Sequence, residues 1–138
     1  FHIEMSTYAA VSKNDDIYKK STSGGVATTL STFIIEKGGV VYGAAFDNAF
    51  NLLHSRIDSV KELHKIQGTK YVQSSIGYSY KQIKNDLKSK TVLFIGTPCQ
   101  VAGLLNYIPN SPILKMQKTS NSETDVIMDF GLNTQIIK

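Results

Sequence analysis

The sequence has one cysteine, no tryptophan and only three prolines among its 138 residues. A single cysteine cannot form an internal disulfide, which is compatible with a reducing cytoplasm. It also cannot supply by itself the four thiolates of a usual iron–sulfur cluster. No apolar run approaches the roughly 18 residues of a membrane span, and residues 1–20 lack the pattern of a signal peptide. These absences predict a cytoplasmic domain without a membrane span.

A cluster of charge of one sign is also missing. Fifteen Lys and Arg against eleven Asp and Glu give a net charge of +4, and the lysines are spread along the chain. Nucleic-acid binding normally needs a basic face, so we expect no nucleic-acid partner. The three histidines show no metal-ligand spacing. We expect His54 in a strand and His64 in a short helix.

The apolar pattern predicts an α/β domain with a mixed sheet and flanking helices, because strand-like and helix-like segments alternate along the chain. Ser23 is the expected N-cap of the first long helix, and Ser59 begins an S-x-x-E capping box. A turn is expected at 13–16, and polar loops at 18–25 and 67–75. Strands are expected over 5–12, 40–46, 51–58 and 91–95, and helices over 26–37, 60–66, 76–87 and from 98 onward.

The pattern weakens after residue 110. Residues 115–124 are polar without periodicity, and 125–130 could form a short strand with no visible partner. We therefore predict one domain over 1–110 and a poorly determined tail over 111–138, as expected of a truncated second half.

The stretch "GTPCQ" contains the only cysteine and follows a buried strand. Thr97 is the expected N-cap, Pro98 the first helical residue, and Gln100 completes a T-x-x-Q capping box. Cys99 then lies in the first helical turn, where free N–H groups attract anions and favour a thiolate. Such a cysteine could be a redox thiolate, a ligand to a cluster completed by other cysteines, or a contact to a cofactor phosphate. The alternative is a small buried residue at a strand-to-helix corner.

Two other loops have a related composition. "STSGG" places hydroxyls and two glycines before a helix, which lets the backbone approach a phosphate, although such a helix start is more often an ordinary cap. "GTKYVQSS" places a lysine beside an aromatic ring and hydroxyls, which suits a flat anionic ligand, although a solvated loop is the alternative. Cofactors of α/β proteins gather at the edge of the sheet where such loops meet.

The three motifs, in this order and spacing, resemble the beta subunit family of coenzyme F-420 hydrogenases and dehydrogenases. The stretches that carry the likeness are "YAAVSKNDDIYKKSTSGGVATTLSTFIIEKGGVVYGAAFD", "KIQGTKYVQSSIG" and "VLFIGTPCQVAGL". The likeness runs from about Tyr8 to Leu105. It implies a flavoprotein, generally with FAD and commonly with 4Fe-4S clusters, that passes electrons between clusters, flavin and a partner. Related proteins also occur in polysaccharide-synthesis settings, often with unassigned substrates.

The resemblance also implies roles for single residues. Cys99 would be a flavin neighbour or a cluster ligand, the latter only with cysteines from outside this chain. No residue is assigned a catalytic role. The implied FAD-site residues are Ser23, Gly24, Gly25, Lys70, Tyr71, Gln73, Ser74, Thr97, Pro98, Cys99 and Gln100.

The sequence departs from the family in two ways. It has no cysteine-rich ferredoxin-like segment, and the family pattern fades from about Asn106. We therefore expect an incomplete member that needs an electron-transfer partner, such as a ferredoxin-like domain or subunit. The competing hypothesis is a non-catalytic fragment or nucleotide-binding module that keeps the fold without cluster or turnover.

Overall fold

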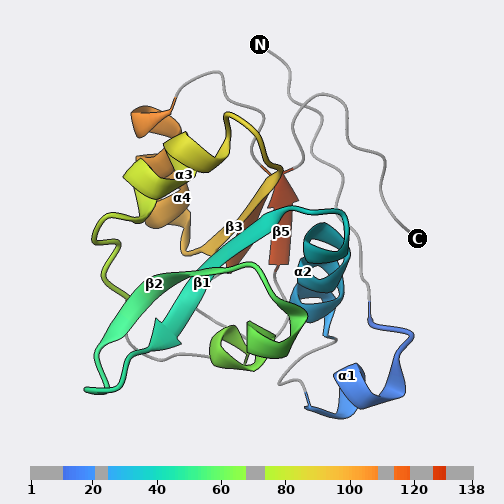
Figure 1. Cartoon of the computed structure of the whole chain (residues 1–138). Helices are drawn as coiled ribbons and strands as arrows, with labels where there is room; N and C mark the ends of the chain where they lie inside the picture. The colour runs from blue at the N-terminus through green and yellow to red at the C-terminus, as the bar shows by residue number, and fades with distance from the viewer. Residues whose placement is uncertain (1–10, 21–24, 68–73, 109–113, 119–125, 130–138) are drawn as a thin grey trace.

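A computed structural model describes residues 11–20, 25–67, 74–108, 114–118 and 126–129 of the chain. Helices and strands alternate along most of this length (Figure 1). The elements are α1 (Asp15–Lys20), α2 (Val26–Glu36), β1 (Val40–Phe46), β2 (Leu52–Ile57), the 3-10 helix η1 (Val60–Ile66), α3 (Ser79–Asp86), β3 (Val92–Gly96), α4 (Pro98–Tyr107), β4 (Leu114–Lys118) and β5 (Val126–Asp129).

The five strands form one mixed sheet in the order β2-β1-β3-β4-β5. The three central strands β1, β3 and β4 are parallel, and β2 and β5 are antiparallel to their neighbours. In the register of the sheet, Val41 is opposite Leu93 on one side and Ile57 on the other. The predicted α/β fold with a mixed sheet and flanking helices is therefore confirmed.

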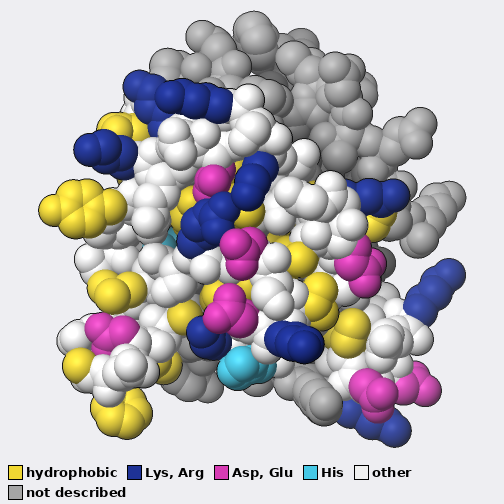
Figure 2. All heavy atoms as spheres, in the orientation of Figure 1, with side chains coloured by type: hydrophobic (Ala, Val, Ile, Leu, Met, Phe, Trp, Pro, Cys, Tyr) yellow, Lys and Arg dark blue, Asp and Glu magenta, His cyan; other side chains and the backbone are white. Residues whose placement is uncertain are grey.

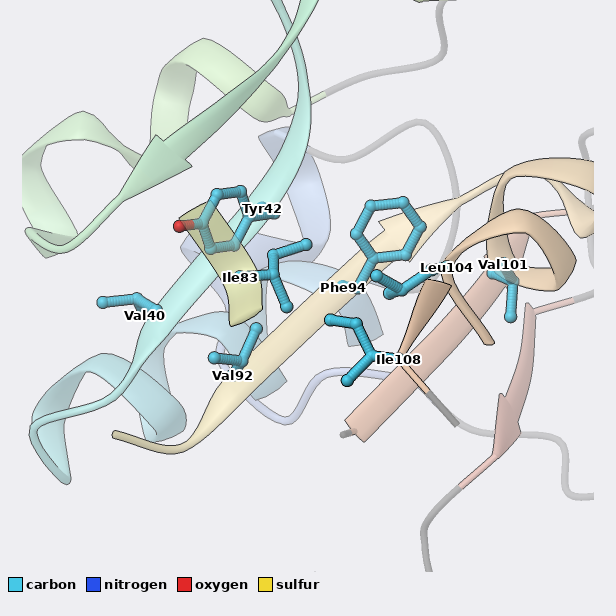
Figure 3. Packing of buried hydrophobic residues seen from close by; sticks show 8 residues of the cluster. All are labelled: Val40, Tyr42, Ile83, Val92, Phe94, Val101, Leu104 and Ile108. Atoms are coloured by element: carbon cyan, nitrogen blue, oxygen red, sulfur yellow. The ribbon is translucent and has the colours of Figure 1, made fainter. Parts of the chain in front are cut away.

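The two faces of the sheet carry separate hydrophobic clusters. On one face, side chains from β1 and β3 meet α3 and α4, and Figure 3 shows these residues directed toward one another. On the other face, the neighbouring residues of the same strands pack against α2 and η1. Figure 1 shows α3 and α4 together on one side of the sheet and α2 on the other. Alternation along the strands thus makes a three-layer structure with helices on both faces.

A tight turn joins α2 to β1 and fixes the start of the central strands. Gly38 has φ +84°, a left-handed conformation that glycine adopts without steric cost. A Cβ on Gly39 would lie 2.7 Å from the Thr91 carbonyl oxygen and 2.6 Å from Ile34 Cγ2. The Val40 N–H donates to the same Thr91 carbonyl at 2.9 Å. The helix expected over 26–37 is α2, which ends one residue earlier at Glu36, and the two glycines that follow allow this close backbone approach.

The central elements follow the sequence pattern closely. The predicted strands over 40–46, 51–58 and 91–95 correspond to β1, β2 and β3, with boundaries moved by one residue at most. The helix expected over 76–87 is α3, with Ile83 buried and Tyr80 partly buried against the core. The short helix expected over 60–66 is present as a 3-10 helix.

Several local predictions are wrong. Residues 13–16 do not form only a turn, because Asn14 Oδ1 accepts hydrogen bonds from the N–H groups of Asp16 and Ile17 and starts α1 there. The N-cap of α2 is Gly25 rather than Ser23, which lies outside the described residues. Ser59 makes no side-chain cap bond. Of the strand expected over 5–12, residues 5–10 lie outside the described part, and Val11 and Ser12 are not in a strand.

The C-terminal part contains strands that the sequence pattern did not predict clearly. β4 begins at Leu114 and covers the first residues of the polar stretch 115–124. It pairs in parallel with β3. The strand expected near 125–130 is β5, and it has the partner that the sequence did not reveal, because it pairs with β4. A strand can pair through its backbone even when its side chains are polar. The polar composition of this stretch therefore gave no sign of β4. The domain boundary at residue 110 stays a prediction, although the sheet continues beyond it.

Candidate functional site

The candidate site lies where β1 and β3 end. α2 runs into β1 through the tight turn at Gly38 and Gly39 and packs on β1 and β3, so its N-terminus lies toward the carboxyl ends of these strands. α4 begins directly after β3, at Thr97. Two helix N-termini therefore lie toward the same edge of the sheet, which is the edge where open α/β sheets bind ligands.

At the start of both helices, no acidic side chain neutralises the positive end of the helix dipole. Neither α2 nor α4 carries an acidic residue in its first turn, whereas α1 and η1 do. Gly25, the N-cap of α2, is buried and has φ +75°, a conformation that favours glycine. The positive end of a helix dipole attracts anions. This edge can therefore accept phosphate-like charge.

The start of α4 has the geometry that its sequence predicts. Thr97 is the N-cap in extended conformation, Pro98 is the first helical residue, and Gln100 Oε1 accepts from the Thr97 N–H at 3.0 Å, as the T-x-x-Q box requires. Gly96 precedes the helix where no side chain fits. A Cβ there would lie 2.7 Å from Phe94 Cε1 and 3.0 Å from Gln100 Oε1. The sequence GTPCQ thus closes β3 tightly onto α4.

Four polar residues join this helix start to the second predicted loop. The Gln100 amide donates from Nε2 to both the carbonyl and the Oγ of Ser74, each at 3.1 Å. Ser74 Oγ lies 2.6 Å from His54 Nδ1, and His54 Nε2 lies 2.7 Å from the Ile95 carbonyl oxygen. We call His54, Ser74, Gln100 and Thr97 the His54 cluster. It brings together residues from two of the three motifs.

The backbone around Ser74 is held in the sheet. The His54 N–H donates to the Ser75 carbonyl and the Ser75 N–H donates to the Leu52 carbonyl, both at 2.9 Å, so this segment lies parallel to β2. Ser79 Oγ donates to the His54 carbonyl at 3.0 Å. Ser74 is therefore fixed by backbone and side-chain contacts together.

His54 is the buried centre of the cluster. Its ring stacks on Phe94 with centroids 4.8 Å apart and an interplanar angle of 25°. Burial lowers the pKa of His54 below its usual value, and the hydrogen bond to the Ile95 carbonyl opposes this only in part. The ring is therefore held in its neutral form near neutral pH.

Cys99 lies at the exposed rim of this cluster. It is exposed, and its Sγ lies 3.2 Å from Thr97 Oγ1. The alternative of a small buried cysteine at the corner is therefore wrong. Tyr80 lies behind this turn, where its hydroxyl donates to the Gln100 carbonyl at 2.6 Å. The pKa of Tyr80 is raised, first by burial and then by the nearby Cys99.

A second polar group lies on the same face of β2. Arg56 pairs with Asp86 through Nε at 2.8 Å, and the Tyr42 hydroxyl donates to the same carboxylate at 2.5 Å. We call Arg56, Asp86 and Tyr42 the Arg56 cluster. Because Arg56 is opposite Tyr42 near the start of β1 and His54 is opposite Ala44, this cluster lies toward the amino ends of the parallel strands. An open hollow of about 480 Å³ adjoins it, lined by Arg56, Lys81, Gln82, Asn85 and Asp86.

The hollow does not include the predicted site residues. Ser74, Thr97 and Gln100 meet in the His54 cluster, whereas Gly25 is placed separately, at the start of α2. Five predicted site residues lie outside the described part of the chain: Ser23, Gly24, Lys70, Tyr71 and Gln73.

Sequence reasoning missed His54. We placed it correctly in a strand but gave it no role, because it has no metal-ligand spacing. One signal was present: His54 alternates with Leu53 and Ser55, and Ile57 marks the opposite, apolar face of the strand. A histidine that faces the covered side of a sheet must find polar partners there.

We also searched the described residues for groups that could hold a metal ion and for helices that could span a membrane. Within the described ranges, no group of three or more His, Cys, Asp or Glu side chains could hold a metal ion. Helices long and apolar enough to cross a bilayer are likewise missing from the part of the chain that the structure describes. On the face shown in Figure 2, Lys and Arg alternate with Asp and Glu instead of forming a patch of one sign.

Fold and site together define an α/β protein with a candidate anion-binding edge. The sequence matches the family model for coenzyme F420 hydrogenase/dehydrogenase, beta subunit, N-terminal part, over residues 7–79, just over half of the chain. The chain belongs to this family. The first two motifs lie within the match, and "GTPCQ" lies beyond it. No curated protein matches the sequence.

A solved structure is similar as well. It is the xenon-derivatised F420-reducing nickel–iron hydrogenase complex from Methanosarcina barkeri, with a TM-score of 0.55 and 25% sequence identity. The likeness covers 67% of this chain and 33% of that chain. The chain thus spans a third of the length of the hydrogenase chain that it resembles.

Proposed function

We propose that this chain is a flavin-dependent electron-transfer domain that binds FAD at the carboxyl ends of β1 and β3. Family membership and the likeness to a chain of an F420-reducing hydrogenase complex support the redox class. The observation that carries the proposal is the junction of Ser74 with Gln100 and Thr97 at the start of α4. Two predicted cofactor loops, 20 or more residues apart in sequence, meet there.

The described residues fit a dinucleotide at this edge. Neither α2 nor α4 has an acidic residue in its first turn, so the positive end of each helix dipole can attract a phosphate. Gly25 lets the backbone turn there without a side chain. FAD, when bound, would supply the hydride and electron chemistry. The chain's own residues would bind its phosphates, orient it at the sheet edge and place Cys99, which is exposed, beside it.

The described residues do not fit a 4Fe-4S cluster. The chain has one cysteine, and a cluster usually needs four thiolates. We therefore assign no electron-transfer step within this chain to a cluster. Electrons would have to come from or go to a partner subunit or domain, and the solved chain that this protein resembles is itself part of a hydrogenase complex.

The first test is FAD uptake by the purified chain. The protein is incubated with FAD, excess cofactor is removed, and the visible absorption spectrum is recorded beside a circular dichroism spectrum. A retained flavin spectrum is the expected result. A folded chain that retains no FAD would contradict the proposal and favour the non-catalytic module.

The matched variants are Gly25→Ala and Gly38→Ala. Both replace a glycine of positive φ, 75° and 84°, at the two ends of α2, so each should cost about 1–2 kcal/mol of stability. Only Gly25 lies at the proposed site. We expect Gly25→Ala to lose FAD while Gly38→Ala retains it, as measured by flavin absorbance. Equal retention in the two variants would show that Gly25 is only a helix cap.

A further inference from the structure

The hydrogen bonds of the His54 cluster can be drawn with protons in only one arrangement when the ring is neutral. The Ile95 carbonyl can only accept, so His54 Nε2 carries the proton and donates at 2.7 Å. Nδ1 must then accept, and Ser74 Oγ donates to it at 2.6 Å. Gln100 Nε2 donates to Ser74, and Gln100 Oε1 accepts from Thr97 N–H. The tautomer of His54 thus sets the direction of its bond with Ser74, whereas the Thr97 N–H and the Ser74 carbonyl fix the orientation of the Gln100 amide.

We propose that neutral His54 is a positioning residue that holds Ser74 against the start of α4, and that its protonation weakens the flavin site by loosening this contact. The inference rests on the proposed function, because it concerns the same FAD site. His54 would not touch the flavin. It acts through Ser74 and Gln100, whose side chains are both buried.

The surroundings of the ring favour the neutral form. β3 contributes Phe94, which stacks on the ring, and β1 contributes Ala44, which is opposite His54 in the sheet. α3 contributes the Ser79 hydroxyl, and α4 contributes the Gln100 amide through Ser74. None of these groups is ionised. The charged residue nearest along β2 is Arg56, which is paired with Asp86 and Asp58.

Protonation of His54 would turn its Nδ1 atom from a hydrogen-bond acceptor into a donor. His54 Nδ1 would become a donor facing Ser74 Oγ, which already accepts from Gln100 Nε2. The Ser74 hydroxyl hydrogen would lose its acceptor inside a buried cluster. A buried donor without a partner is costly, so the contact between Ser74 and α4 should loosen. The burial that lowers the pKa of His54 moves this change to acidic pH.

The direct test is FAD affinity against pH, with three variants. We expect the affinity of the wild-type chain to fall by about tenfold between pH 7.5 and the pH where His54 is protonated, which corresponds to one lost hydrogen bond. His54→Asn keeps an acceptor near the Nδ1 position and cannot be protonated in this range, so its affinity should not vary with pH. Ser74→Ala should bind weakly at every pH. His64→Gln, an exposed control in η1, should behave as wild type.

A second measurement does not depend on flavin. Nitrogen-15 NMR of the His54 ring reports the tautomer. Hydrogen-exchange protection of the Thr97 amide reports the contact at α4, and the amide of Leu87, the C-cap of α3, is the reference. We expect the Nε2–H tautomer at pH 7.5 and a selective loss of Thr97 protection as His54 titrates. A ring protonated at Nδ1, or Thr97 protection that ignores the titration, would overturn the inference.

The two measurements separate the two proposals. If the wild-type chain binds no FAD but Thr97 protection follows the titration of His54, the proposed function fails and the positioning role stands. If FAD binds with an affinity that does not change while His54 titrates, the function stands and the positioning role fails.

Discussion

His54 and Arg56 lie two residues apart on one face of β2, and the two polar clusters that they belong to differ in charge and in exposure to solvent. The His54 cluster is neutral, its His54, Ser74 and Gln100 side chains are buried, and its hydrogen bonds join uncharged groups. The Arg56 cluster is charged, and the side chains of Arg56 and Asp86 are 29% and 12% exposed. Charge is therefore kept where solvent can reach it, toward the amino ends of the parallel strands. The uncharged cluster lies toward the carboxyl ends of these strands, where the segments of Ser74 and Gln100, which we propose to bind the cofactor, meet.

This difference predicts that the two clusters respond to different perturbations. The His54 cluster depends on close packing and on one neutral ring. The Arg56 cluster depends on ion pairing that joins strand β2 to helix α3. Each of the following changes should disturb one cluster and leave the other in place.

The largest effect is expected from Phe94→Ala. The Phe94 side chain is fully buried, supports the His54 ring and packs with α3 and α4. Its removal should lower the free energy of unfolding by about 3–5 kcal/mol, as measured by urea denaturation. Tyr107→Ala, at a partly exposed aromatic on α4, is the control and should cost much less. Equal losses would show that Phe94 has no special place in the core.

A smaller effect is expected from Asp86→Ala. The change leaves the Tyr42 hydroxyl without its acceptor and Arg56 with only Asp58 as an acidic partner. We expect a loss of about 1–3 kcal/mol. Asp58→Ala removes the exposed partner of the same arginine and should cost no more than about 0.5 kcal/mol. Urea denaturation measures the free energy of unfolding of both variants. Similar decreases in the two would mean that the burial of Asp86 contributes nothing to stability.

The smallest effect is a difference in acid sensitivity. The pKa of His54 is lowered by burial, so its contribution to stability is complete above the ordinary histidine value of 6.5 and is lost as the pH falls below it. The slope cannot exceed about 1.4 kcal/mol per pH unit for one group. Thermal unfolding of wild type and His54→Asn between pH 7.5 and 5 measures it. Parallel curves would contradict a buried neutral ring.

The contribution of the Arg56 cluster to stability should be lost only at a lower pH than that of the His54 cluster. Burial alone would raise the pKa of Asp86, but hydrogen bonds from Arg56 and Tyr42, together with the positive charges of Arg56 and Lys90, outweigh burial and lower it below the ordinary 3.8. Its contribution is therefore present above that value and lost as the pH falls below it. In the same experiment, Asp86→Ala should match the pH dependence of wild type down to about pH 5, because Asp86 does not titrate there.

The sequence allowed most of the central fold to be predicted, because β1 and β3 are continuous apolar runs and α3 has regular helical spacing. It also located the start of α4, where Thr97, Pro98 and Gln100 act through local geometry. It did not locate β4, because strand pairing with β3 is a long-range contact that leaves no local signal.

The site was predicted only in part for a similar reason. Ser74 and Gln100 were chosen as members of two separate loops, and their mutual hydrogen bond was not foreseen. The residue that joins them, His54, comes from a third segment. Local patterns identify helix caps and loop glycines well. They cannot identify a buried polar residue whose partners lie 20 and 41 residues away.

The crowded turn at Gly39 has a consequence for how loops in this protein can be exchanged. Because the Gly39 backbone lies against the Thr91 carbonyl, β1 and β3 are fixed to each other at the end of the sheet opposite the proposed cofactor site. A strand fixed at one end cannot slip in register when the segment at its other end changes length. The chain should therefore serve as a frame onto which the loops of related proteins can be transplanted, provided that residues 38 and 39 remain glycine.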